Sequence, residues 1–149
     1  MKYVILLLRN LHDIYNFLVD FGGSALNISS DEIFNLTTHV EAWRRNIAPN
    51  LRITPVALRH VEVLGDRGGA TPTELARLFG VSTGSETVVI NKLRAQELIE
   101  LSDNKLDRRS KVVSLTEKGQ TIYAKYTTWR KLFLETLQPE DFCRNSASD

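Results

Sequence analysis

The stretch TPTELARLFGVS, residues 71–82, decides the fold. It opens with Thr71, a capping hydroxyl in front of a proline, and Glu74 three positions later completes a capping box that starts a helix. Gly80 interrupts the apolar run that follows, and Ser82 supplies a second N-cap. The stretch therefore predicts two short helices joined by a tight turn, which is the layout of a helix-turn-helix.

The segment after this stretch predicts a β-hairpin. The second short helix is expected to run from Ser82 to about Gln96, and residues 98–101 and 112–115 then read as β-prone strands. Between them, residues 102–111 are polar and charged and form a long tip. A basic hairpin directly after a helix-turn-helix lets a helix enter the major groove of DNA while the hairpin reaches along the backbone.

Helices are also expected on both sides of this region. They cover residues 3–21, 29–49, 54–68 and 116–139, where capping residues, stop signals or apolar side chains at helical spacing indicate helical structure. The fold class is therefore mainly α with a small β-hairpin wing. We expect a single domain over 1–149, made of a winged helix-turn-helix lobe (54–116), a helical dimerisation region (1–53 and 117–137) and a polar tail (138–149).

The composition agrees with one globular domain, because the chain has 149 residues, 42% of them hydrophobic and 25% charged. The net charge is only +1, yet residues 102–131 hold eight Lys or Arg against three Asp or Glu. Residues 132–149 hold one against four. The basic charge is therefore concentrated around the predicted hairpin and the helix after it, as either a solvated face or a nucleic-acid contact.

Cysteine usage and hydropathy indicate the compartment. Cys143 is the single cysteine, so no intramolecular disulfide can form and nothing in the sequence demands an oxidising environment. The apolar run at residues 3–8 is too short for a signal peptide or a membrane span. We therefore expect a cytoplasmic protein without membrane contact.

Five motifs carry a resemblance to a known family, at residues 71–76, 79–82, 98–100, 107–109 and 113–119. Over roughly residues 31–140 the chain resembles the MarR (multiple-antibiotic-resistance regulator) family, most specifically where Asp-x-Arg is followed by a strand and Leu-Thr-x-x-Gly. The resemblance implies a homodimeric transcription regulator without a cofactor. It also implies that Arg109 enters the minor groove and that Asp107 braces it, which agrees with the attraction of arginine to a narrow minor groove.

The expected recognition helix departs from the family. Relatives often have arginine at the positions of Thr83 and Val88 and a buried aliphatic residue at the position of Glu86. Without these arginines, hydroxyl, amide and methyl contacts remain, and the sequence preference is expected to be weaker or AT-leaning. The candidate DNA-binding residues are Ser82, Thr83, Ser85, Thr87, Val88 and Asn91 on the helix, and Lys105, Asp107, Arg108, Arg109 and Lys111 in the wing.

Glu86 is the least expected residue of this helix, because a buried carboxylate is costly unless paired and an exposed one repels phosphate. Two interpretations stay open. Glu86 accepts from a cytosine amino group, or it pairs with a nearby basic residue such as Arg77 or Lys92 and leaves DNA binding impaired. Gly84 costs the helix about 1 kcal/mol relative to alanine, which indicates close backbone approach to phosphate or to another helix.

The dimer interface and a ligand site are also expected by resemblance. The final helix of the family would begin after residue 139, where this chain has little sequence left, so we expect the apolar stripe of residues 3–21 to supply the interface. Many relatives sense small aromatic ligands in a crevice that Trp43, His60 and Trp129 could line here. Aromatic residues at helical spacing more often belong to the core, and the histidines lack the spacing of metal ligands.

Two further classes of function are alternatives to a DNA-binding regulator: an enzyme and a protein-binding module. The chain has no phosphate-binding glycine loop, Gly-x-Ser-x-Gly elbow or His-Glu-x-x-His motif, so no catalytic residue is expected. The second class is a winged helix that binds protein, or an antagonist of a DNA-binding regulator, for which Glu86 and the missing arginines argue. The sequence favours a repressor that binds an approximately palindromic duplex as a homodimer, with relief by a small ligand as an added hypothesis.

Overall fold

The computed structural model describes residues 30–136 and divides the chain into two compact units. One unit is Ile53–Thr128, and the other combines Met1–Arg52 with Trp129–Asp149, of which residues 30–52 and 129–136 are described. The helix expected at residues 3–21, the polar tail at 138–149 and Cys143 lie outside the described residues.

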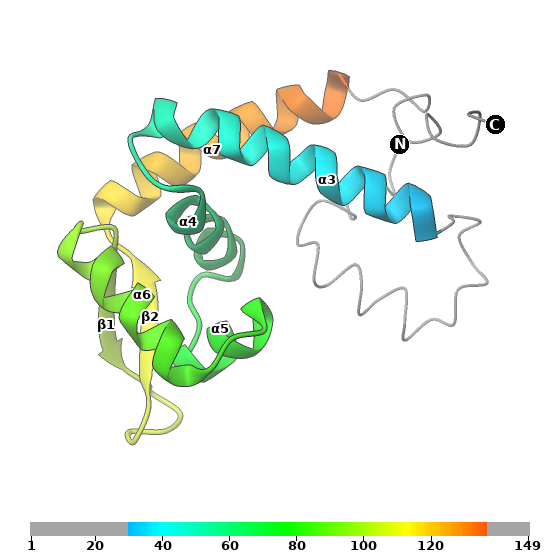
Figure 1. Cartoon of the computed structure of the whole chain (residues 1–149). Coiled ribbons are helices and arrows are strands. Elements are labelled where there is room, and N and C mark those ends of the chain that lie inside the picture. Colours follow the sequence, from blue (N-terminus) through cyan, green and yellow to red (C-terminus); the bar gives the residue numbers. More distant parts are fainter. Residues whose placement is uncertain (1–29, 137–149) are drawn as a thin grey trace. The chain divides into compact units, whose positions relative to one another are not determined.

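The unit Ile53–Thr128 is a helix-turn-helix followed by a hairpin (Figure 1). Its elements are α4 (Pro55–Arg67), α5 (Pro72–Phe79), α6 (Thr83–Ala95), β1 (Ile99–Asp103), β2 (Lys111–Leu115) and the first part of α7 (Glu117–Thr136). The strands are antiparallel, with Ile99 opposite Leu115 and Asp103 opposite Lys111. The predicted fold class, mainly α with a small β-hairpin wing, is confirmed.

Side chains cap the helices at the residues that the sequence indicated. The Thr54 hydroxyl accepts from the Ala57 N–H at 3.1 Å at the start of α4. At α5, the Thr71 hydroxyl accepts from the Glu74 N–H, and the Glu74 carboxylate accepts from the Thr71 N–H at 2.7 Å. These bonds to Thr71 lower the pKa of Glu74 below its ordinary value of 4.5. The predicted capping box is therefore formed.

The turn between α5 and α6 requires the glycine that the sequence places there. Gly80 has φ 65°, in the left-handed region that residues with a Cβ avoid, and its N–H bonds back to the end of α5. The Ser82 hydroxyl then accepts from the Ser85 N–H at 3.1 Å and starts α6. This short connection sets α6 directly after α5, as the helix-turn-helix layout requires.

Several predicted boundaries differ from the structure by one or two residues. The first strand begins at Ile99 and extends to Asp103, because Leu98 bonds instead to the end of α6 through Leu93 and to the start of α7 through Thr116. Another difference concerns Pro49, which does not end α3 (Ser30–Ile47) directly. The helix ends two residues earlier and continues as the 3-10 helix η1 (Ala48–Leu51).

The core of this unit lies between the three short helices and the hairpin. It includes Leu58, Val61 and Leu64 from α4, Leu75 from α5, Ile90 and Leu93 from α6, and Val113 from β2, all nearly inaccessible to solvent. Ala70, between α4 and α5, exchanges two backbone hydrogen bonds with Val113 at 3.0 and 2.8 Å. This bridge ties the hairpin to the helices and was not predicted.

The described part of the other unit is helical. It contains α3, η1 and the end of α7, and the Trp43 and Phe133 rings stack with centroids 4.6 Å apart. Phe34 is 70% exposed and Leu132 is 55% exposed. None of the helices that the structure describes is both long and apolar enough to cross a membrane.

The Leu-Thr-x-x-Gly motif, residues 115–119, joins the hairpin to α7, and close packing explains its glycine. The Thr116 hydroxyl donates to the Glu97 carbonyl at 2.5 Å and accepts from the Gly119 N–H at 3.1 Å. A Cβ on Gly119 would lie 2.2 Å from the Leu98 carbonyl oxygen. The first turn of α7 therefore fits against the strand entry only with glycine at this position.

Gly119→Ala is expected to lower the free energy of unfolding by roughly 1–3 kcal/mol, because backbone must move to admit the methyl group. Gly84→Ala is the matched control, since its Cβ would meet only the Ser82 hydroxyl at 3.9 Å and a helical Gly→Ala change gains about 1 kcal/mol. Urea unfolding measures both. Equal stability of the two variants would contradict the packing argument.

Candidate nucleic-acid interface

The candidate residues on α6 share one exposed helix face. The structure leaves Ser82, Thr83, Ser85, Thr87, Val88 and Asn91 exposed to solvent. The opposite side of the helix buries Glu86, Ile90 and Leu93, spaced four and three residues apart. The helix therefore offers a continuous polar face from its first turn to its middle, interrupted only by the Val88 methyl groups.

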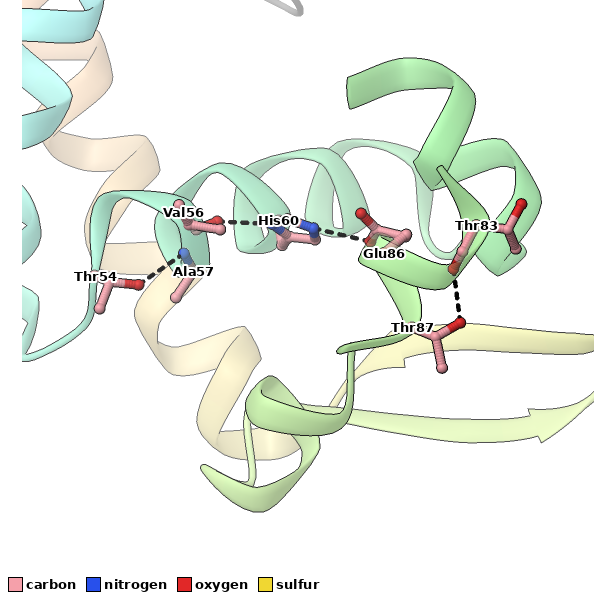
Figure 2. Close-up of polar contacts among 7 residues, drawn as sticks. All are labelled: Thr54, Val56, Ala57, His60, Thr83, Glu86 and Thr87. Atoms are coloured by element: carbon pink, nitrogen blue, oxygen red, sulfur yellow. Dashed lines mark hydrogen bonds and ion pairs between the residues drawn. The ribbon is translucent and has the colours of Figure 1, made fainter. Parts of the chain in front are cut away.

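The hydroxyl groups on this face differ in what they can still bind. Ser82 accepts from the Ser85 N–H and donates to the Ser85 hydroxyl oxygen at 2.9 Å, so its own hydrogen is used within the cap. Thr87 donates to the Thr83 carbonyl at 2.8 Å (Figure 2). Ser85 can therefore donate outward, whereas Thr87 is left to accept, as an exocyclic amino group of adenine or cytosine would require.

Glu86 is buried and hydrogen-bonded to a residue of another helix. Its side chain is in the core, with 1% of the residue exposed, and its Oε1 lies 2.9 Å from Nε2 of His60 on α4 (Figure 2). The contact with a cytosine amino group is therefore wrong, because Glu86 points into the core. The expected pairing with a basic residue is found, but the partner is His60 and not Arg77 or Lys92. The rotation of α6 that buries Ile90 turns Glu86 toward α4.

The two polar residues on apolar helix faces are thus each other's partner. The available signal was that His60 interrupts the apolar stripe of α4 as Glu86 interrupts that of α6. Pairing them needed the crossing of the helices, which periodicity within one helix does not supply.

The hydrogen bonds of His60 fix where its protons lie. Nδ1 is 2.7 Å from the Val56 carbonyl oxygen, which only accepts, so Nδ1 carries a hydrogen and donates it. Nε2 lies 2.9 Å from Oε1 of Glu86, so both ring nitrogens are hydrogen-bonded inside the unit. The buried carboxyl of Glu86 therefore has a hydrogen-bond partner, which limits its desolvation cost.

The aromatic candidates for a ligand crevice fall in different units. His60 belongs to Ile53–Thr128, and both of its ring nitrogens are hydrogen-bonded within that unit. Trp43 and Trp129 belong to the other unit, where Trp43 stacks on Phe133. His60 therefore has no ring nitrogen left for a ligand.

The tip of the wing is organised by hydrogen bonds across it. Asn104 bonds to Ser110 through its backbone N–H at 3.1 Å and through its side-chain amide at 2.8 Å. The Asn104 side-chain oxygen also accepts from the Leu106 N–H at 3.0 Å. The tip is thus an ordered turn, and it exposes 98% of Leu106, a residue that the sequence analysis did not single out.

The charged side chains of the wing have different surroundings. Asp107 accepts from the backbone N–H of Arg109 at 3.0 Å, so the brace acts on the backbone that carries the arginine. Lys111 forms an ion pair with Asp103 on the facing strand, a pair that the sequence analysis missed and that is too exposed to contribute much stability. Lys105, Arg108 and Arg109 are exposed at the tip.

The arrangement combines a polar helix face with a cationic hairpin tip on one compact unit. Such a pair of elements can contact base edges through the helix and phosphate or the minor groove through the tip. Within the described residues no three His, Cys, Asp or Glu side chains come together as a metal site. The fold and this surface define a winged helix-turn-helix protein.

Comparison with known proteins narrows this class. A profile of the MarR family matches residues 53–110. The HTH-type transcriptional repressor NicR of Pseudomonas putida is 30% identical over 71 residues, and the match spans 48% of this chain and 45% of NicR. The winged-helix region of the chain is therefore similar to the MarR family, and the match spans less than half the length of NicR.

Solved structures agree on the fold. Streptococcus pneumoniae FabT in complex with DNA has a TM-score of 0.61 at 24% identity, over 72% of this chain and 82% of that one. A mutant MarR from E. coli complexed with operator DNA has a TM-score of 0.60 at 20% identity, over 74% of this chain and 83% of that one.

Proposed function

We propose that this protein is a cytoplasmic, homodimeric transcription regulator that represses by binding an approximately palindromic DNA duplex. The observation that carries the proposal is the exposed polar face of α6 on the same unit as a wing tip that exposes Arg108 and Arg109. MarR-family members are transcription regulators, and NicR is named as a repressor. The FabT and MarR structures contain DNA, which supports the same partner here.

The proposed contacts follow from the chemistry of the exposed groups. With α6 in the major groove, Asn91 presents the amide that pairs with adenine, and Val88, 53% exposed, can pack on a thymine methyl group. Arg109 at the wing tip would enter a minor groove, where A·T-rich sequence is narrow and strongly negative. An AT-leaning half-site is the expected preference.

The dimer and the ligand extend this proposal to the other unit. Residues 1–53 and 117–137 would form the dimerisation region, and two-fold symmetry would place the half-sites about one helical turn apart. A small aromatic ligand would act near Trp43 and Trp129. DNA release by that ligand would relieve repression.

A protein-binding winged helix remains the alternative, and one observation still favours it. The exposed face of α6 carries none of the arginines that read guanine in relatives. The burial of Glu86 removes the other argument, because a carboxylate within the core does not repel phosphate.

Selection from a random duplex pool tests the proposal. The wild type is expected to enrich a palindrome, and Arg109→Ala should bind it roughly tenfold more weakly at the same salt concentration. Arg67→Ala, which removes the same charge from the exposed end of α4, is the control and should bind like the wild type. No enrichment by any of the folded proteins would favour the protein-binding alternative.

Gly84→Ala separates DNA contact from stability. A Cβ at Gly84 would meet only the Ser82 hydroxyl, at 3.9 Å, so no neighbouring helix within the unit explains the glycine. The proposed reason is the approach of a phosphate to the first turn of α6. The variant is expected to unfold at higher urea concentration yet bind DNA several-fold more weakly, as read by fluorescence anisotropy. Gln96→Ala, at the exposed C-terminal end of the same helix, is the control. Unchanged DNA affinity of Gly84→Ala would contradict a phosphate contact at the first turn of α6.

A further inference from the structure

We propose that the buried pair of His60 and Glu86 positions the recognition helix, so that DNA affinity depends on this hydrogen bond as well as on the exposed residues. The inference rests on the proposed function of α6 as the DNA-reading helix. His60 and Glu86 are positioning residues, because both are buried, at 4% and 1% exposure, and neither can touch DNA.

Three helices meet at the His60 ring. α4 carries the ring, α5 contributes the Phe79 ring with its centroid 4.3 Å away, and α6 contributes Glu86. The Arg59 guanidinium lies over the Phe79 ring, 5.1 Å from its centroid. A displacement of α6 would therefore disturb the contacts of the His60 ring, which involve α4 and α5 as well as α6.

Hydrogen bonds fix the His60 ring on α4 and fix α4 against α7. Its Nδ1 bond to the Val56 carbonyl sets its rotation on α4. α4 is in turn joined to α7 by two hydrogen bonds, from the Tyr126 hydroxyl to Glu62 at 2.5 Å and from the Tyr123 hydroxyl to Asp66 at 2.6 Å. Nε2 of His60 therefore has a fixed position, and α6 is attached to it through Glu86.

Glu86 lies between the residues that would read DNA. Ser85 and Thr87 are its sequence neighbours, and both point to the exposed side while Glu86 points inward. The buried contacts of Ile90 and Leu93 hold the later turns of α6, so the first turn depends on Glu86 for its attachment to α4. A rotation of this turn would move the Ser85 and Thr87 hydroxyls away from base edges.

The hydrogen bond supplies direction that apolar packing lacks. A bond between Nε2 and Oε1 is favourable only near 2.9 Å and near linearity, whereas the burial of aliphatic groups has no preferred direction. An aliphatic pair can therefore restore the stability of the core without restoring the position of the helix.

Four variants of the full chain test this role, each assayed for urea stability, for affinity to the duplex that the wild type enriches, and for backbone amide NMR shifts of residues 82–87. Glu86→Gln is the conservative variant, because its amide N–H can donate to Nε2 of a neutral imidazole. Glu86→Leu and His60→Leu each remove one partner. The double variant His60→Leu with Glu86→Leu replaces the pair by apolar groups and keeps the test valid if a single variant fails to fold.

Glu86→Gln is expected to keep the wild-type amide shifts and to bind within about twofold of the wild type. The double variant is expected to recover stability, yet to shift the amides of the first turn and to bind at least tenfold more weakly, about the loss of one base contact. A stable double variant with wild-type affinity would show that the pair is only a core contact. Equal losses in Glu86→Gln and the double variant would also overturn the proposal.

DNA binding by the wild type distinguishes failure of the positioning role from failure of the proposed function. If the folded wild type enriches no duplex, the regulator assignment fails and the role of the pair in DNA binding fails with it. If the wild type binds and only the pattern among the variants is wrong, the regulator assignment stands without the positioning role.

Discussion

The hydrogen bond between His60 and Glu86 joins the helix that precedes the helix-turn-helix to the helix that would read DNA. It is made inside the core, where an unpaired carboxylate would destabilise the fold by several kcal/mol. Nε2 of His60 gives the Glu86 carboxyl a hydrogen-bond partner, and the Val56 carbonyl fixes the orientation of the ring that presents Nε2. Because Ser85 and Thr87 flank Glu86, the same contact that closes the core also determines where the exposed face of α6 points.

Local chemistry predicted the elements of the fold. Thr71, Gly80, Ser82 and Thr116 act at short range, so their caps and turns could be recognised from neighbouring residues alone. The boundaries that differed depend on contacts between distant segments. β1 extends to Asp103, opposite Lys111 on the other strand, and spacing along the sequence does not reveal such a partner.

The exposed residues of the candidate site were predictable from the sequence, whereas the role of Glu86 was not. The sequence placed the hydroxyl and amide residues on one face of α6 and the cations at the wing tip, because helical periodicity and hairpin topology determine both. It did not assign Glu86, because a carboxylate on an apolar face has a meaning only once its partner is known. The resemblance to the MarR family likewise indicated a brace by Asp107, and the structure places that brace on the backbone N–H of Arg109.

The central claim is that this winged helix binds duplex DNA through phosphates and grooves. The most direct measurement is the affinity of the wild type for its selected duplex as a function of salt concentration. Lys105 and Arg108 from two protomers would neutralise about four phosphates, so affinity should fall roughly a hundredfold between about 50 and 200 mM salt. A folded dimer whose affinity is flat across this range, or that binds no duplex, would contradict the account.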